Sequence, residues 1–80
     1  MKRIAKDSRQ DREAVMAAAT SFFGPDGLGL EIAERSDGCV TFEGGGGFVR
    51  VSSEPRDHGS AVEVETAEWE QPATQFLADL

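Results

Sequence analysis

Three carboxylates, Glu31, Glu43 and Glu65, are the residues of this sequence with the clearest capacity for chemistry. On one surface they would supply oxygen ligands for a divalent cation, or a negative patch that attracts a basic partner. The same residues also suit a plain solvated face, because net charge keeps a small protein soluble and monomeric. The sequence leaves these three interpretations open.

Three other features invite a catalytic interpretation, and none has the neighbours that catalysis requires. Cys39 is the only cysteine, and we expect no basic group other than Arg35 near enough to activate its thiol. His58 follows Asp57 in a predicted turn, but no nucleophile is placed beside them. The glycines at 44–47 lack the lysine and the helix that follow the glycines of nucleotide-binding loops. We therefore predict no catalytic residue and no cofactor.

The elements that position the carboxylates are indicated by an alternation of apolar and polar residues between positions 28 and 66. A period of two with one apolar face is typical of antiparallel strands that are buried on one side. The pattern predicts a sheet of four strands that follow one another along the chain. Its apolar positions are Leu28, Leu30 and Ile32, then Val40 and Phe42, then Val49 and Val51, and finally Val62 and Val64.

The turns decide how these strands align, because residues directly opposite one another share a face of the sheet. At 36–38 we favour a three-residue loop with Gly38 in the left-handed conformation, since a two-residue turn would mix the two faces. The glycines at 45–46 suit a two-residue turn, and the third connection, around 55–59, is expected to be longer. The resulting pairs are Ile32 with Phe42, Phe42 with Val49, Val40 with Val51, Val51 with Val62, and Val49 with Val64.

The opposite face of the predicted sheet carries the candidate binding residues. Its rows are Glu31, Glu43, Phe48 and Glu65; Ala33, Thr41, Arg50 and Glu63; and Arg35, Cys39, Ser52 and Ala61. Arg50 would lie opposite Glu63, whereas Glu31 opposite Glu43 would be a repulsive pair. Phe48 among carboxylates is a plausible anchor for a partner. The candidate partner-binding residues are Glu31, Glu43, Phe48, Arg50, Glu63 and Glu65.

A helix is predicted on each side of the strand region along the chain. The first spans about residues 8–23, with Asp7 or Ser8 as its cap, and it ends before Gly24. The second spans 72–80, because proline is favoured at the first helical position. We expect both helices to pack on the apolar sheet face of one α+β domain, residues 1–80, with the order α-β-β-β-β-α. Residues 1–6 are expected to form a flexible basic arm.

Charge and composition limit the partners of the protein. The formal net charge is −7 at pH 7, and residues 14–80 hold three basic and twelve acidic side chains. Such a surface repels phosphate, which argues against nucleic acid as a ligand. A single cysteine fits a reducing compartment, which predicts a cytoplasmic protein. No stretch approaches the ~20 apolar residues of a membrane span.

These observations favour a small non-catalytic protein–protein interaction module. It would bind a protein partner or a second copy of itself through the outer sheet face or through a sheet edge, the edges being 28–35 and 60–66. The alternative is a metal- or small-molecule-binding enzyme that uses Glu31, Glu43 and Glu65. Eighty residues leave little room for the deep pocket that the alternative requires.

Overall fold

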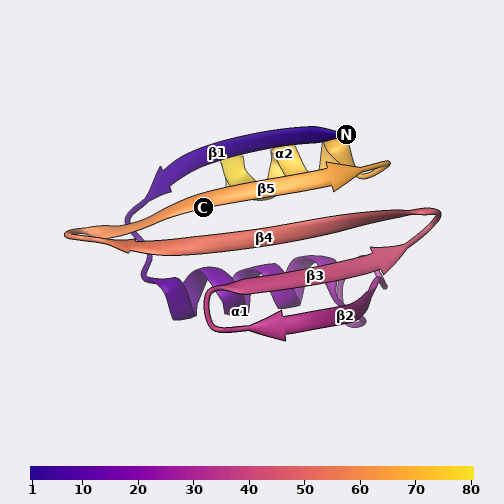
Figure 1. Ribbon diagram of the computed structural model, residues 1–80, viewed down its shortest axis with the longest axis horizontal. Coiled ribbons are helices and arrows are strands. Elements are labelled where there is room, and N and C mark those ends of the chain that lie inside the picture. Colours follow the sequence, from indigo (N-terminus) through magenta and orange to yellow (C-terminus); the bar gives the residue numbers. More distant parts are fainter.

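A computed structural model describes residues 1–80 as one antiparallel sheet of five strands with two helices (Figure 1). The elements along the chain are β1 (Lys2–Ser8), α1 (Arg12–Phe23), β2 (Glu31–Ser36), β3 (Cys39–Gly44), β4 (Gly47–Arg56), β5 (Gly59–Ala67) and α2 (Glu70–Ala78). The strands are arranged in the order β1-β5-β4-β3-β2. The predicted α+β class and antiparallel sheet are confirmed, but the predicted number of four strands is wrong. Neither helix has the length and apolar character needed to cross a membrane.

The additional strand, β1, forms from residues that we expected to be a flexible basic arm. It pairs with β5 along its whole length, and this pairing places Ile4 opposite Val64 and Lys6 opposite Val62. Its charged residues hide the usual strand pattern, because Ile4 is the only large apolar residue in the segment. The sheet therefore ends in β1 and β2, and β5 is an inner strand instead of the edge that we expected.

The start of α1 moves four residues along the chain because β1 extends to Ser8. Asp11 caps the helix, and its Oδ1 accepts a hydrogen bond from the backbone N–H of Ala14 at 2.8 Å. The caps expected at Asp7 and Ser8 are therefore wrong. The end of the helix at Phe23, before Gly24, is as predicted.

The hairpin of β2 and β3 has a shorter turn than we expected. Ser36 lies opposite Cys39, so only two residues form the turn, although Gly38 does adopt a positive φ of 74°. The predicted pair of Ile32 with Phe42 is nevertheless present. The two-residue turn and the pairing of Ile32 with Phe42 are compatible only because β2 contains one extra residue.

That extra residue is Ala33, which forms a β-bulge between Ile32 and Glu34. A bulge adds one residue to a strand and so reverses the faces of the residues that follow it. Glu34 consequently takes the outer position opposite Thr41 that we assigned to Ala33. Arg35 lies opposite the buried Val40, on the inner face, and its predicted place on the outer face is wrong.

The two hairpins that follow differ in how well the sequence predicted them. The turn at 45–46 has two residues, and Phe42 lies opposite Val49 as expected. The β4–β5 turn also has only two residues, at 57–58, where we expected a longer connection. Val51 therefore pairs with Val64 instead of Val62, a shift of two residues that keeps every side chain on its face. The hairpin extends well beyond β3 at the left of Figure 1.

The last helix, α2, begins at Glu70, two residues before the predicted start at Pro72. Proline is tolerated there because the first N–H groups of a helix have no partner within it. Trp69 precedes the helix and donates a hydrogen bond from its indole Nε1 to the carbonyl of Gly44 at 2.9 Å. This bond ties the start of α2 to the turn between β3 and β4.

One core joins both helices to the sheet. The ring of Phe23 lies 5.5 Å from that of Phe42 and 5.2 Å from that of Phe76, measured between centroids. In Figure 1 both helices are seen behind the strands. The buried apolar residues are Val15, Ala19, Phe23, Leu30, Val40, Phe42, Val49, Val51, Val62, Val64, Ala73, Phe76 and Leu77. We call the side of the sheet that carries them the inner face and the other side the outer face.

Lys6 provides a test of how β1 is held in place. Its Nζ donates hydrogen bonds to the carbonyls of Leu77 and Leu80, at 2.9 and 2.8 Å, at the end of α2. A cation at this position also interacts favourably with the helix dipole. We expect Lys6→Met, which keeps an apolar stem, to lower the free energy of unfolding by about 1–2 kcal/mol. Urea denaturation measures this change. Lys2→Met, which removes no such bond, is the control, and equal effects of the two substitutions would contradict the prediction.

Candidate functional site

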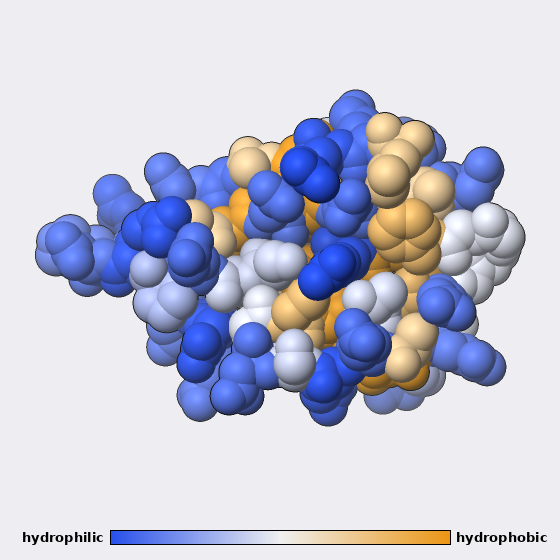
Figure 2. All heavy atoms as spheres, in the orientation of Figure 1, coloured by the Kyte–Doolittle hydropathy of each residue, from blue (hydrophilic) through white to orange (hydrophobic).

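All six predicted partner-binding residues lie on the outer face. Glu31 lies opposite Glu43, and Phe48 lies on the other side of Glu43, as the sequence predicted. Phe48 is only half-buried, and its neighbour on β5 is Ala67 instead of Glu65. Figure 2 shows mostly polar residues in the orientation of Figure 1, with apolar atoms most continuous toward the end that holds the N-terminus.

The shifted alignment of β5 changes the partners of Arg50. This residue lies opposite Thr41, as predicted, and opposite Glu65, where we expected Glu63. Its Nε donates a hydrogen bond to the Sγ of Cys39 at 3.3 Å, so the expectation that no basic group other than Arg35 lies near this thiol is wrong. The pKa of Arg50 is raised, first by the hydrogen bond and charge interaction with Cys39 and then by the charges of Glu65 and Glu34. Like any arginine, Arg50 is protonated at every physiological pH.

Arg3 of β1 is a residue of this face that the sequence analysis missed. Its Nη2 lies 3.2 Å from Glu65 and its Nε lies 3.5 Å from Glu63. With Arg50 on the other side of Glu65, the acidic residues of β5 are compensated by cations. Recognition of β1 as a strand would have revealed this pairing, because Arg3 lies directly opposite Glu65.

The strip along β2 and β3 is different, because its acidic residues have no such partners. Glu31, Glu34 and Glu43 make no ion pair. Glu31 and Glu43 are both exposed and directly opposite each other. The outer face thus divides into a compensated half on β1, β5 and β4 and an acidic strip on β2 and β3.

The acidic residues do not assemble into a metal site. No three His, Cys, Asp or Glu side chains are grouped so that they could hold a metal ion. Glu65 lies beside Arg50 and Arg3 instead of near Glu43, because β5 is shifted by two residues relative to the predicted alignment. The set Glu31, Glu43 and Glu65 is therefore divided between the two halves of the outer face.

The most open part of the sheet is β2 itself. Every residue of this strand is exposed, and the strand pairs only with β3. Ile32 points toward the inner face but remains 37 % exposed, and the nearby Leu28 is 43 % exposed. The edge therefore combines unpaired backbone groups with accessible apolar side chains.

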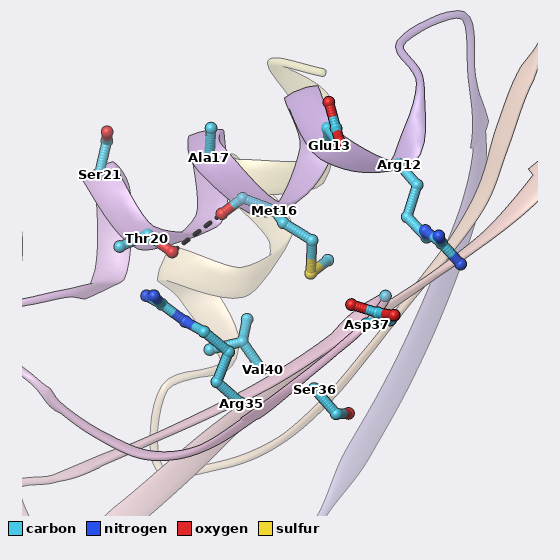
Figure 3. Close-up of a pocket in the computed structure, with 11 residues that line it drawn as sticks. Arg12, Glu13, Met16, Ala17, Thr20, Ser21, Arg35, Ser36, Asp37 and Val40 are labelled. Carbon is cyan, nitrogen blue, oxygen red and sulfur yellow. Dashed lines mark hydrogen bonds between the residues drawn. The ribbon is translucent and has the colours of Figure 1, made fainter.

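A groove of about 540 Å³ lies beside this edge, between α1 and the β2–β3 turn. Met16, Ala17 and Val40 are its apolar residues, and Arg35 and Arg12 are its cations. Figure 3 shows the side chain of Arg35 rising from β2 toward the turn of α1 that carries Thr20, with Arg12 at the opposite end. The sequence analysis missed this groove because Arg35 reaches the inner face only through the bulge at Ala33.

Arg35 has no partner within the protein. It makes no ion pair, although Asp37 and Glu13 also line the groove. The hydroxyl of Thr20 is already engaged, since its Oγ1 donates to the carbonyl of Met16 at 2.9 Å. The Arg35 guanidinium is consequently free to receive an acidic group from outside.

The repulsion between Glu31 and Glu43 can be measured. Glu43→Gln removes one of two facing charges, so we expect it to raise the free energy of unfolding by about 0.2–1 kcal/mol. Glu65→Gln removes a charge that lies near Arg3 and Arg50, and should lower it by a similar amount. Urea denaturation at low and high salt checks both, and both effects should shrink in salt. Destabilisation by Glu43→Gln would contradict the prediction.

Comparison with known proteins gives no further assignment for this arrangement. No family model, no curated protein and no solved structure matches the chain. The geometry of the β2 edge, the adjoining groove and the acidic strip is therefore the basis for a functional proposal.

Proposed function

We propose that the protein is a non-catalytic protein–protein interaction module that binds an extended segment of a partner along β2. The observation that carries this proposal is the exposure of all six residues of β2 at the sheet edge. The N–H and C=O groups on the free side of an edge strand can hydrogen-bond to an added strand. Main-chain bonds of this kind supply affinity, while side chains on alternate positions supply specificity.

The two edges of the sheet differ, and the difference favours β2 over β1. α2 packs against β1 and β5, and α1 packs against β3, β4 and β5. We infer that both helices cover the inner face and that β2 lies beyond their cover. Lys6 on the inner side of β1 already binds the end of α2. Covering helices, inward-pointing charges and bulges all protect an edge strand. β1 has an inward-pointing lysine and the contact with α2, whereas β2 has the bulge and the inward-pointing Arg35 but no helix packed against it to the same extent.

The groove beside β2 supports the same proposal. Side chains of an added strand that point inward would meet Ile32, Met16 and Ala17, which offer apolar contact next to the edge. The outer face, the other surface considered from the sequence, is less favourable over β1, β5 and β4. Its acidic residues there already pair with Arg3. A cytoplasmic location remains part of the proposal, supported by the single free cysteine, Cys39.

The proposal predicts where selected peptides bind. Twelve-residue peptides selected from a random phage-displayed library should shift amide resonances of β2 and the groove when titrated into the labelled protein. Ile32→Lys places a charge on the inner side of the edge and should weaken binding about tenfold. Ala5→Lys, at the middle of the exposed β1 edge, should leave the affinity unchanged. Shifts confined to β1 or to the outer face would show that the proposal is wrong.

Modified peptides test strand addition without changing the protein. In an added strand only every second amide faces β2, since the N–H groups of an edge strand alternate in direction. We expect N-methylation of one alternate set of amides to abolish binding and N-methylation of the other set to leave it intact. Equal effects of the two sets would exclude β-strand addition.

A further inference from the structure

We infer that the segment bound along β2 is an antiparallel strand with basic side chains toward the outer face and an apolar and an acidic side chain toward the inner face. This inference rests on the proposed function and specifies the chemistry of the partner. The charges on the two sides of β2 carry the argument, because each side presents one sign that the protein itself leaves unpaired.

The outer side of β2 requires basic groups. Glu31 and Glu34 point to this side, and Glu43 of β3 lies directly behind Glu31. None of the three makes an ion pair. The nearest cation along the row of Glu34 is Arg50, which lies beyond Thr41 and already faces Glu65. Lysine or arginine side chains of an added strand would relieve this repulsion.

The inner side of β2 requires an apolar and an acidic group. Ile32 is partly exposed there, and Arg35 points into the groove without an ion pair. Asp37, the acidic residue of the adjacent turn, lies in Figure 3 toward the Arg12 end of the groove. A carboxylate opposite Arg35 would therefore gain a charge-assisted hydrogen bond that no group of the protein provides.

Because of the bulge, the side chains of a regular strand can face this pattern of charges in register. Because Ala33 is the extra residue, β2 presents Glu31 outward, Ile32 inward, Glu34 outward and Arg35 inward. A regular strand also alternates between faces at every residue. Four consecutive residues of the types basic, apolar, basic and acidic, read from the position opposite Glu31 to the position opposite Arg35, therefore match all four side chains.

A second copy of the chain does not meet these requirements. Two β2 strands related by a two-fold axis would place outer face beside outer face and inner beside inner. Glu31 and Glu34 would then meet the same glutamates, and Arg35 would face only Ile32 and Arg35 of the other β2 strand. Like charges across a strand pair are destabilising. We therefore expect the protein to remain monomeric in size-exclusion light scattering over a hundredfold concentration range.

Two synthetic ten-residue peptides test the inference directly. In the first, lysines occupy the positions opposite Glu31 and Glu34, valine the position opposite Ile32 and glutamate the position opposite Arg35. In the second, lysine and glutamate are exchanged. We expect calorimetry and amide shifts to show that the first binds at β2 about tenfold more tightly. The difference should fall at high salt.

A charge reversal on the protein supplies the matched control. Arg35→Glu should weaken binding of the first peptide about fivefold, and replacing the peptide's glutamate by lysine should restore it. Arg35→Gln, which introduces no new charge, should weaken binding without that rescue. Arg35 is exposed, so neither substitution removes a core contact.

The outcomes separate this inference from the proposed function. Equal binding of both peptides at β2, or no rescue of Arg35→Glu, would overturn the inferred charge pattern and leave strand addition standing. Library-selected peptides that bind at β2 but carry acidic residues toward Glu31 would also overturn it. A dimer that Ile32→Lys dissociates would make a second copy the occupant and the inference wrong. If no peptide binds at β2 in any of these experiments, both proposals fail.

Discussion

The packing of Phe23 against Phe42 and Phe76 is the contact on which the other elements depend. Helices of twelve and nine residues are too short to be stable in isolation. Phe23, at the end of α1, brings that helix onto β3 and also contacts α2, so each helix is stabilised by the same cluster. The sheet depends on the same cluster, because its strands are buried on one face only. Loss of this cluster would therefore release both helices together.

Basic residues near the start of the sequence and acidic residues later in it are brought together by the fold. The basic residues of the N-terminal segment join β1, where Arg3 meets the glutamates of β5 and Lys6 meets the carbonyls at the end of α2. The outer-face glutamates that make no ion pair lie away from β1, on the strip formed by β2 and β3. Residues 31–44 carry −3 of the total net charge of −7, and they include the β2 edge of the sheet.

The alternation of apolar residues predicted the buried positions of β3 to β5, because burial on one face imposes a period of two. It was wrong for β2, which begins at Glu31 instead of Leu28 and has no buried residue. It could not reveal β1, whose stability comes from β5 and from Lys6 bonds to α2. It also could not determine the lengths of the turns, since a shift of two residues between β4 and β5 leaves every side chain on the same face of the sheet. The bulge at Ala33 was not predicted, and this error had the largest effect. The bulge moves Arg35 to the inner face, where the residue lines the groove beside the edge. The six residues of the outer face were placed correctly as a set, and so were their neighbours across β2, β3 and β4, but the pairs between β4 and β5 were not.

The shortness of β2 has a consequence for the lifetime of any complex. A six-residue strand interrupted by a bulge offers only a few main-chain bonds, and a bulge increases the local twist, which limits how far a regular strand can follow it. So small a contact area belongs to the class of weak, rapidly exchanging complexes. Avidity would then come from repetition: a partner that carries several copies of the recognised segment, or several of these domains held together, would be retained far longer than one strand alone.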